Sequence, residues 1–275
     1  MQEFTKMSAA GNDFVIIDSR DEDISLSKAQ IKHLANRQNI GCDQLIIIRD
    51  QKGSKIDCFI EIYNSDGSQA QACGNATRCV AKMLFEENPD KKQVTIKTIA
   101  DNLQCWLEED NTVSVKMGIP KFTWQKIPMK EKCDTQNIEL FDRTFHALNI
   151  GNPHVVNFDK KAASDQVFFD IAPKIETHEI FPERTNVEFA KIIKDDVIQV
   201  RVWERGTGET LACGSGACAV GALAIKHGLI KKDQVTIRFK GGNIKISWPD
   251  QSKSIIMNGD CQKEFSGPLN SNLLS

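Results

Sequence analysis

The sequence has almost no net charge. Thirty-five Lys and Arg residues nearly balance thirty-seven Asp and Glu residues, which gives a formal charge of −2 at pH 7. A chain without a basic surplus has no overall field that would attract nucleic acid or anionic lipid. We therefore expect a small-molecule substrate, and neither nucleic acid nor a membrane as a partner.

Long apolar segments are also missing. The first residues, M-Q-E-F-T-K-M-S, lack the basic stretch followed by an apolar run that a secretory signal needs. The longest notable uncharged stretch, residues 210–225, is 16 residues long, whereas about 20 apolar residues are needed to span a bilayer. These absences predict a cytoplasmic protein.

No C-x-x-C pair occurs among the nine cysteines. An odd number of cysteines without an export signal argues against a disulfide framework. A structural zinc site would have to gather ligands from distant segments, so we predict no metal site. Most of the thiols are expected to be packing groups. The nine are Cys42, Cys58, Cys73, Cys79, Cys105, Cys133, Cys213, Cys218 and Cys261.

An internal repeat organises what is present. The length of 275 residues suggests two domains, and residues 60–75, I-E-I-Y-N-S-D-G-S-Q-A-Q-A-C-G-N, align without a gap with residues 200–215, V-R-V-W-E-R-G-T-G-E-T-L-A-C-G-S. The offset of 140 residues places Asn64 on Glu204 and Cys73 on Cys213. Self-similarity at a fixed period indicates one structural unit written twice.

The same offset extends toward the N-terminus. G-N-D-F-V-I-I, beginning at residue 11, falls on G-N-P-H-V-V-N, beginning at residue 151. Asn12 then lies opposite Asn152, and Phe14 lies opposite His154.

The pattern of each half predicts an α+β fold. Helices are expected at residues 74–87 and 214–227, and the second is apolar all round, so it should be enclosed. Outer helices are expected within residues 21–38 and 162–175. Alternating or β-branched runs predict strands at residues 14–17, 45–48, 58–63, 94–98, 112–117, 155–158, 187–190, 197–203, 235–239 and 244–248.

These elements predict two pseudo-symmetric units, each a curved mixed or antiparallel sheet wrapped around a central buried helix. The Gly118-Ile119-Pro120 segment is a natural boundary. We expect an N-terminal unit at residues 1–117 and a C-terminal unit at residues 118–258, with the tail, residues 259–275, returning to the first unit.

Cys73 and Cys213 each precede a predicted helix in the motif A-C-G. A thiol at a helix N-terminus faces unpaired backbone N–H groups and the positive end of the helix dipole, which lower thiol pKa values. The residues that follow, Gly74-Asn75 and Gly214-Ser215, leave those N–H groups accessible to a carboxylate. The repeat therefore predicts two reactive thiols, each coupled to an anion site.

Two acid–base groups related by a pseudo-two-fold axis suit inversion at carbon, because one can remove a proton while the other delivers one. Nothing in the sequence resembles a pyridoxal phosphate or metal apparatus, so we predict no cofactor. Two other classes remain open: a redox pair of thiols, although C-x-x-C spacing is missing, and a non-enzymatic binding module.

The motifs around Cys73 and Cys213, the opening K-M-S-A-A-G-N-D-F, and G-N-P-H at residue 151 together resemble diaminopimelate epimerase over nearly the whole chain. The resemblance implies a cofactor-independent isomerase of lysine and peptidoglycan precursor biosynthesis that interconverts LL- and meso-diaminopimelate. It also implies a homodimer, with an active site in the cleft between the two units. Ala9 stands where the family usually has Gly, and Cys42 lies where a small or apolar residue is common.

Roles follow from the resemblance residue by residue. Cys73 and Cys213 are the expected catalytic acid–base pair, and His154 and Glu204 are expected to adjust the thiol pKa values. The expected substrate-binding residues are Asn12, Gln44, Asn64, Gly74, Asn75, Asn152, Asn186, Glu204, Arg205, Gly214 and Ser215. The alternative is a cofactor-independent racemase of another amino acid, of the glutamate or proline type, on the same scaffold.

Overall fold

The computed structural model describes residues 2–159 and 164–269. These residues form two compact units. Unit 1 contains the chain up to Val115 together with the segment from Gly259 onward, and unit 2 contains Lys116–Asn258. Among the described residues, no helix is both long and apolar enough to cross a membrane.

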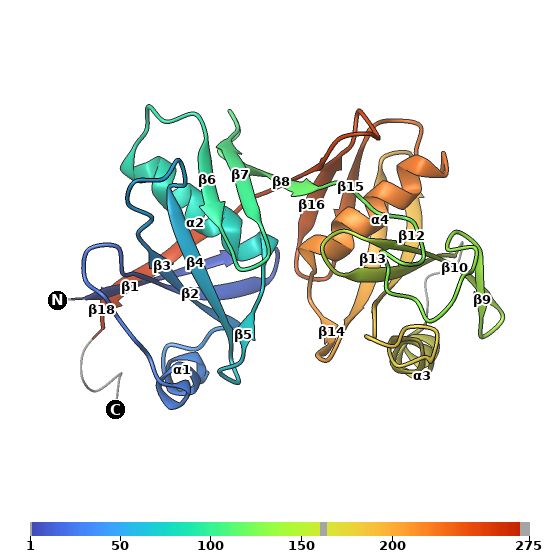
Figure 1. Cartoon of the computed structure of the whole chain (residues 1–275), viewed down its shortest axis with the longest axis horizontal. Coiled ribbons are helices and arrows are strands. Elements are labelled where there is room, and N and C mark those ends of the chain that lie inside the picture. Colours follow the sequence, from blue (N-terminus) through green and yellow to red (C-terminus); the bar gives the residue numbers. More distant parts are fainter. Residues whose placement is uncertain (1, 160–163, 270–275) are drawn as a thin grey trace. The chain divides into compact units, whose positions relative to one another are not determined.

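Unit 1 is a mixed sheet with two helices (Figure 1). Its strands follow the order β18-β1-β2-β3-β4-β6-β7-β8, with β5 forming a short hairpin against β4. The β2–β3 and β4–β6 pairs are parallel and the others are antiparallel. The elements are β1 (Glu3–Ala9), β2 (Asn12–Asp18), α1 (Lys28–Ala35), β3 (Gln44–Arg49), β4 (Cys58–Asn64), β5 (Gln69–Ala70), α2 (Gly74–Glu87), β6 (Val94–Lys97), β7 (Asn102–Leu107), β8 (Val113–Gly118) and β18 (Gln262–Pro268).

Unit 2 repeats this topology. Its strands follow the order β9-β10-β11-β12-β13-β15-β16-β17, β14 forms the hairpin on β13, and the parallel pairs are β11–β12 and β13–β15. The elements are β9 (Ile138–Leu140), β10 (Arg143–Asn149), β11 (Pro153–Phe158), α3 (Asp165–Glu176), β12 (Asn186–Lys194), β13 (Val197–Glu204), β14 (Gly208–Thr210), α4 (Gly214–Lys226), β15 (Gln234–Arg238), β16 (Asn243–Ser247) and β17 (Ile255–Gly259).

One helix in each unit lies against the inner face of the curved sheet. In unit 1, α2 packs on β1, β2, β6 and β7; in unit 2, α4 packs on β10, β11, β12, β15 and β16 (Figure 1). Ten of the residues of α4 are buried, as its apolar sequence predicts. Gly221 of α4 lies so close to β16 that a Cβ added there would be 2.6 Å from Ile246 Cγ2.

Helix α4 ends in a Schellman motif. Gly228 has a φ of +66°, a conformation that glycine adopts at little cost. Its N–H donates to the Ile225 carbonyl at 3.1 Å, and the Leu229 N–H donates to the Ala224 carbonyl at 2.9 Å. The helix expected at residues 214–227 therefore ends one residue earlier, at Lys226, with His227 as its C-cap.

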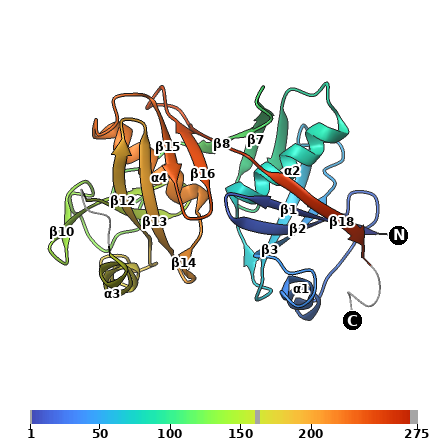
Figure 2. The ribbon, with the colours of Figure 1, turned by 180° about the vertical axis from the view of Figure 1, so that it is seen from behind.

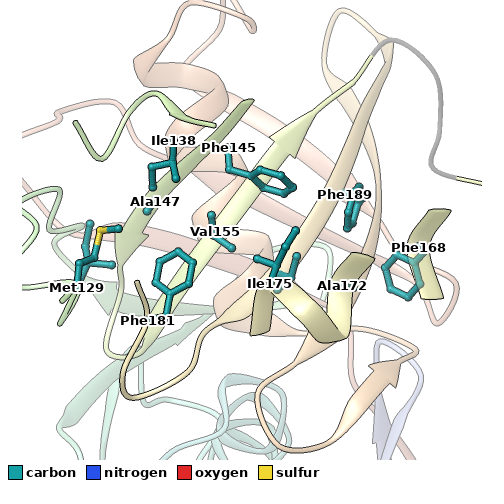
Figure 3. Close-up of a cluster of buried hydrophobic side chains, with 12 residues drawn as sticks. Met129, Ile138, Phe145, Ala147, Val155, Phe168, Ala172, Ile175, Phe181 and Phe189 are labelled. Carbon is teal, nitrogen blue, oxygen red and sulfur yellow. The ribbon is translucent and has the colours of Figure 1, made fainter. Parts of the chain in front are cut away.

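The outer helices cover the other face of the strands. In unit 2, Phe168, Ala172 and Ile175 of α3 pack with Val155 and Phe189 in one buried cluster (Figure 3). In unit 1, α1 covers β2 and β3 in the same way. The central strands are therefore buried on both faces, which explains why they read as continuous apolar runs instead of alternating ones.

The outer helices are shorter than the segments in which they were expected. Helix α1 begins only at Lys28, because Ser27 and Gln30 form a capping box there. Before it, Ser19 bonds to the Glu22 carbonyl and accepts from the Ile24 N–H, which makes a turn. Helix α3 begins at Asp165 and is capped by Ser164; residues 162 and 163 of the predicted segment lie outside the described residues.

The tail forms a strand. Residues of β18 pair antiparallel with β1, from Glu3 opposite Pro268 to Ser8 opposite Gln262 (Figure 2). Unit 1 thus gains an edge strand from the end of the chain, at the place that β9 holds in unit 2.

Candidate active site

Cys73 and Cys213 are the N-cap residues of α2 and α4. Both have extended backbone conformations, with φ of −151° at Cys73 and −135° at Cys213. Each cysteine follows the short hairpin strand of its unit, β5 or β14, so the two thiols hold equivalent places in the repeated topology. The Gly216 N–H donates to Cys213 Sγ at 3.4 Å, and the Ser215 hydroxyl lies 3.4 Å from the same sulfur.

Amide side chains gather near the helix start in unit 1. Asn75, the second residue of α2, donates from Nδ2 to Asn12 Oδ1 at 2.8 Å and so ties the helix start to β2. On the neighbouring strands, Gln44 donates to Asn64 Oδ1 at 3.0 Å. Asn64 in turn donates to the hydroxyl of Ser68 in the loop that leads to β5.

Unit 2 holds a corresponding group of polar side chains. Asn152 Oδ1 lies 2.9 Å from His154 Nε2. Asn186 donates to the Pro153 carbonyl at 2.8 Å and accepts from the Arg205 backbone N–H at 2.9 Å. Asn186 therefore fixes the start of the loop after β13, from which the Arg205 side chain extends.

Arg205 is not held by an ion pair with Glu204. Its Nη1 donates to the Glu183 carbonyl at 3.2 Å, a contact that a carboxylate could replace. A guanidinium can bind a carboxylate through two parallel hydrogen bonds.

Glu204 is partly buried beside the helix start. Burial raises the pKa of its carboxyl group above the usual range, while hydrogen bonds from Thr210 and Cys213 act in the opposite direction. This carboxylate and the Cys213 thiol thus belong to one hydrogen-bonded group.

The expectation of a lowered thiol pKa is wrong for Cys213. Burial raises the pKa of this thiol well above its usual value, and the nearby carboxylates of Glu204 and Glu188 raise it further. Hydrogen bonds from Ser215 and Gly216 lower it, but by less. The helix start was the only influence visible in the sequence, and here desolvation outweighs it.

Glu188 is a polar residue near this site that sequence reasoning missed. Its side chain is fully buried, and its Oε1 lies 2.6 Å from His154 Nδ1. A detectable signal existed, because a glutamate stands inside N-V-E-F-A, a segment predicted as a buried strand. Charged residues are almost never fully buried without a partner.

The remaining cysteines divide as expected. Cys79 and Cys218, on the same helices as the two N-cap cysteines, are completely buried. Seven of the nine cysteines are buried in total, Cys73 is partly exposed, and Cys133 is exposed. Burial raises the pKa of Cys42 to about 11, as befits a packing thiol.

The comparisons with known proteins agree with one another. The family model described as "Diaminopimelate epimerase" matches residues 4–123 and 146–264, one segment in each half of the chain. A diaminopimelate epimerase of Pelagibacter ubique is 46% identical, over 92% of this chain and 93% of that protein. A diaminopimelate epimerase of Sphingopyxis alaskensis is 40% identical, over 96% of each chain.

A solved structure supports the fold alone. The structure of a predicted epimerase from Pseudomonas aeruginosa matches with a TM-score of 0.71 at 12% identity, covering 98% of this chain and all of that one. Since the family model covers most of both halves and the relatives span nearly the full length, the chain belongs to the diaminopimelate epimerase family.

Proposed function

We propose that the chain interconverts LL- and meso-diaminopimelate, and that Cys73 and Cys213 act on opposite faces of one α-carbon. The observation that carries the proposal is the repeated N-cap cysteine: both halves of a chain of this family offer one thiol at an equivalent helix start. No pyridoxal phosphate or metal is required, because the thiols themselves transfer the proton.

The two thiols have opposite roles in each direction of the reaction. Burial and the nearby carboxylates raise the pKa of Cys213, which favours its thiol form and its role as proton donor in one direction of the reaction. Cys73 then removes the α-proton as a thiolate, and the roles exchange in the reverse direction. A pair that shares one proton in this way titrates as a coupled system and gives a bell-shaped pH profile.

The α-carboxylate binds at the helix starts. The backbone N–H groups of Gly74 and Asn75, and of Gly214 and Ser215, stabilise negative charge that develops when the α-proton leaves. Asn12, Gln44, Asn64, Asn152 and Asn186 supply neutral amide groups, which can hold both the ammonium and the carboxylate of an amino acid.

Arg205 selects a substrate with a second carboxylate. Its guanidinium contacts the Glu183 carbonyl, and we propose that the distal carboxylate of diaminopimelate replaces this contact. A one-ended amino acid cannot make the same bidentate pair. This step separates the proposed substrate from the one-ended substrate of a proline-type racemase, whereas glutamate, which has a distal carboxylate on a shorter chain, is separated by the assay below.

The test is a direct assay with an amino-acid panel. Purified protein in the presence of a reductant is incubated with LL-diaminopimelate, proline or glutamate, and the stereoisomers are separated. Formation of meso-diaminopimelate without inversion of proline or glutamate supports the proposal. Inversion of proline or glutamate, at a kcat/KM comparable to that for diaminopimelate, would favour the alternative racemase.

We also propose a homodimer that works in the cytoplasm, where thiols stay reduced. The support for the dimer is the family resemblance. Light scattering on the purified protein tests it: a mass of twice the 30.8 kDa chain is expected, and a mass equal to one chain would contradict it.

A further inference from the structure

His154 and Glu188 form a buried pair on the inner face of the unit 2 sheet. Both side chains have no exposed surface, and the His154 Nδ1 to Glu188 Oε1 distance is 2.6 Å. The other ring nitrogen, Nε2, lies 2.9 Å from the side-chain amide of Asn152. The imidazole is therefore held at both nitrogens, by a carboxylate on one side and an amide on the other.

The register of the sheet explains the pairing. Strands β11 and β12 are parallel, with His154 opposite Asn186 and Val156 opposite Glu188. Successive side chains alternate between the faces of a sheet, so residues two apart share a face. Glu188 consequently points to the same face as Asn186 and His154, the face that α4 covers.

Glu188 also reaches the start of α4. A Cβ added at Gly216 would lie 2.8 Å from Glu188 Oε1 and 3.5 Å from Cys213 Sγ. The carboxylate oxygen and the sulfur thus flank the same point, and only a glycine leaves room for both. Glu188 Oε2 has no hydrogen-bond partner among the described residues, so part of the carboxylate's negative charge is left uncompensated.

Unit 1 has no histidine–glutamate pair at the equivalent positions. In its equivalent register, Phe14 lies opposite Gln44 and Ile16 lies opposite Ile46. Phe14 therefore occupies the place of His154, and Ile46 occupies the place of Glu188; both are completely buried. Ala76 stands at the position equivalent to Gly216. The fold is satisfied by an apolar pair here, so the polar pair of unit 2 needs another explanation.

We propose that Glu188 is a positioning residue of the acid–base machinery, whose buried carboxylate fixes the His154 ring with Nδ1 protonated and places negative charge beside the Cys213 sulfur. The inference deepens the proposed function and depends on it for its catalytic meaning. Nδ1–H donates to Glu188, and the unprotonated Nε2 accepts a hydrogen bond from the Asn152 side-chain amide once a half-turn of that amide puts its NH₂ group in place of Oδ1.

Burying a carboxylate is costly unless hydrogen bonds or charges compensate for it. The His154 N–H and the nearby α4 start provide that compensation, and the remaining negative potential acts on Cys213. The carboxylates that act on this thiol are Glu204 from β13 and Glu188 from β12. His154 from β11 pairs with Glu188 and acts on Glu204. The two halves of the repeat therefore differ: Cys213 has carboxylates near it, whereas the apolar pair of unit 1 puts no charge at the equivalent place.

The first test is Glu188→Gln, which keeps the shape of the side chain but removes its charge. Nitrogen-15 NMR of the histidine rings, assigned with His154→Phe, should show Nδ1 protonated in the wild type and a mixture of tautomers in Glu188→Gln. Alkylation of Cys213 by iodoacetamide at pH 8, followed by mass spectrometry, should become at least tenfold faster. Asp159→Asn, at the end of β11, removes one charge elsewhere in unit 2 and should leave both readouts unchanged.

The second variant carries the unit 1 pair into unit 2, as His154→Phe with Glu188→Ile. Because this pair is compatible with the fold in unit 1, the double variant is expected to fold, with an at least tenfold loss of kcat and faster Cys213 alkylation. Neither NMR nor alkylation uses a substrate, so both readouts stand even if the wild type does not epimerise diaminopimelate. An unchanged tautomer and an unchanged alkylation rate in Glu188→Gln would overturn the inference.

Discussion

The backbone N–H of Gly216 donates to Cys213 Sγ at 3.4 Å, which holds the thiol against the first turn of α4. A helix start favours the thiolate, yet burial and two carboxylates raise the pKa of this cysteine. The opposing influences suit a group that must give up its proton only when a carbanion forms beside it. The predictions below separate these influences.

Replacing Glu204 by Gln should lower the pKa of the Cys213 thiol. Removal of a neighbouring negative charge makes the thiolate less unfavourable, so the thiol loses its proton at a lower pH. The high-pH limb of the kcat profile should move to lower pH, and kcat at neutral pH should fall on the order of 10²-fold. Steady-state kinetics between pH 6 and 10 measure both effects; a high-pH limb that stays in place would show that Glu204 does not act on the thiol.

Each of the two N-cap cysteines should be indispensable. Cys73→Ala and Cys213→Ala should each reduce kcat by about 10²- to 10⁴-fold, the range that a positioned acid or base contributes. The matched control is Cys133→Ala, which removes an exposed thiol of unit 2 and should keep full activity. Full epimerisation by Cys73→Ala would favour an enzyme in which Cys73 is not an acid–base group.

Arg205→Met should change selectivity more than stability. Without Arg205, the distal carboxylate of bound diaminopimelate has no guanidinium partner, so kcat/KM for diaminopimelate should fall at least about 10²-fold. Turnover of one-ended amino acids, however slow, should be unaffected. Arg143→Met, which removes an arginine that pairs with Asp159 in the same unit, serves as the control. Equal losses in both variants would argue against a clamp.

Asp13 should stabilise unit 1 in a pH-dependent way. Burial raises the pKa of this carboxyl, but hydrogen bonds from Arg37 and Lys6 outweigh it and lower the pKa to about 2. A group with a lowered folded-state pKa contributes stability above its unfolded value, near 3.8, and loses that contribution as the pH falls through about 2. Lys6, at 2.6 Å, is itself buried.

Asp13→Asn should therefore lower the free energy of unfolding at pH 7 by about 1.5–3 kcal/mol, the range for a hydrogen bond to a charged group. The difference from the wild type should shrink as the pH approaches 2. Asp195→Asn is the control, because that carboxylate is exposed in the turn between β12 and β13. Urea unfolding at pH 7 and pH 3 gives the comparison, and a pH-independent difference would contradict the assignment.

Much of the fold could be predicted from the repeat. The offset of 140 residues matches Cys73 with Cys213, and the predicted helix at residues 74–87 is confirmed at both ends. Strand β1, E-F-T-K-M-S-A, was missed because a lysine stands at one of its buried positions. Lys6 is buried there because it pairs with Asp13. Strand β10, exactly one repeat later, was missed with it.

The pKa of the Cys213 thiol could not be predicted from the sequence. A helix start can be recognised in A-C-G, but the desolvation of Cys213 depends on how tightly α4 packs into its sheet. The Glu188 contact with His154 depends on the register of β11 with β12, which joins residues 34 positions apart. Neither distance nor burial can be obtained from spacing along the chain.

The most direct test of a two-thiol inversion is the fate of solvent deuterium. LL-diaminopimelate is incubated with the enzyme in deuterated water, and the reaction is stopped at low conversion for analysis by mass spectrometry. Two thiols on opposite faces predict deuterium at one α-carbon of the meso product and almost none in the recovered LL substrate. Equal labelling of product and recovered substrate would indicate a single base, and no labelling of either would contradict proton transfer altogether.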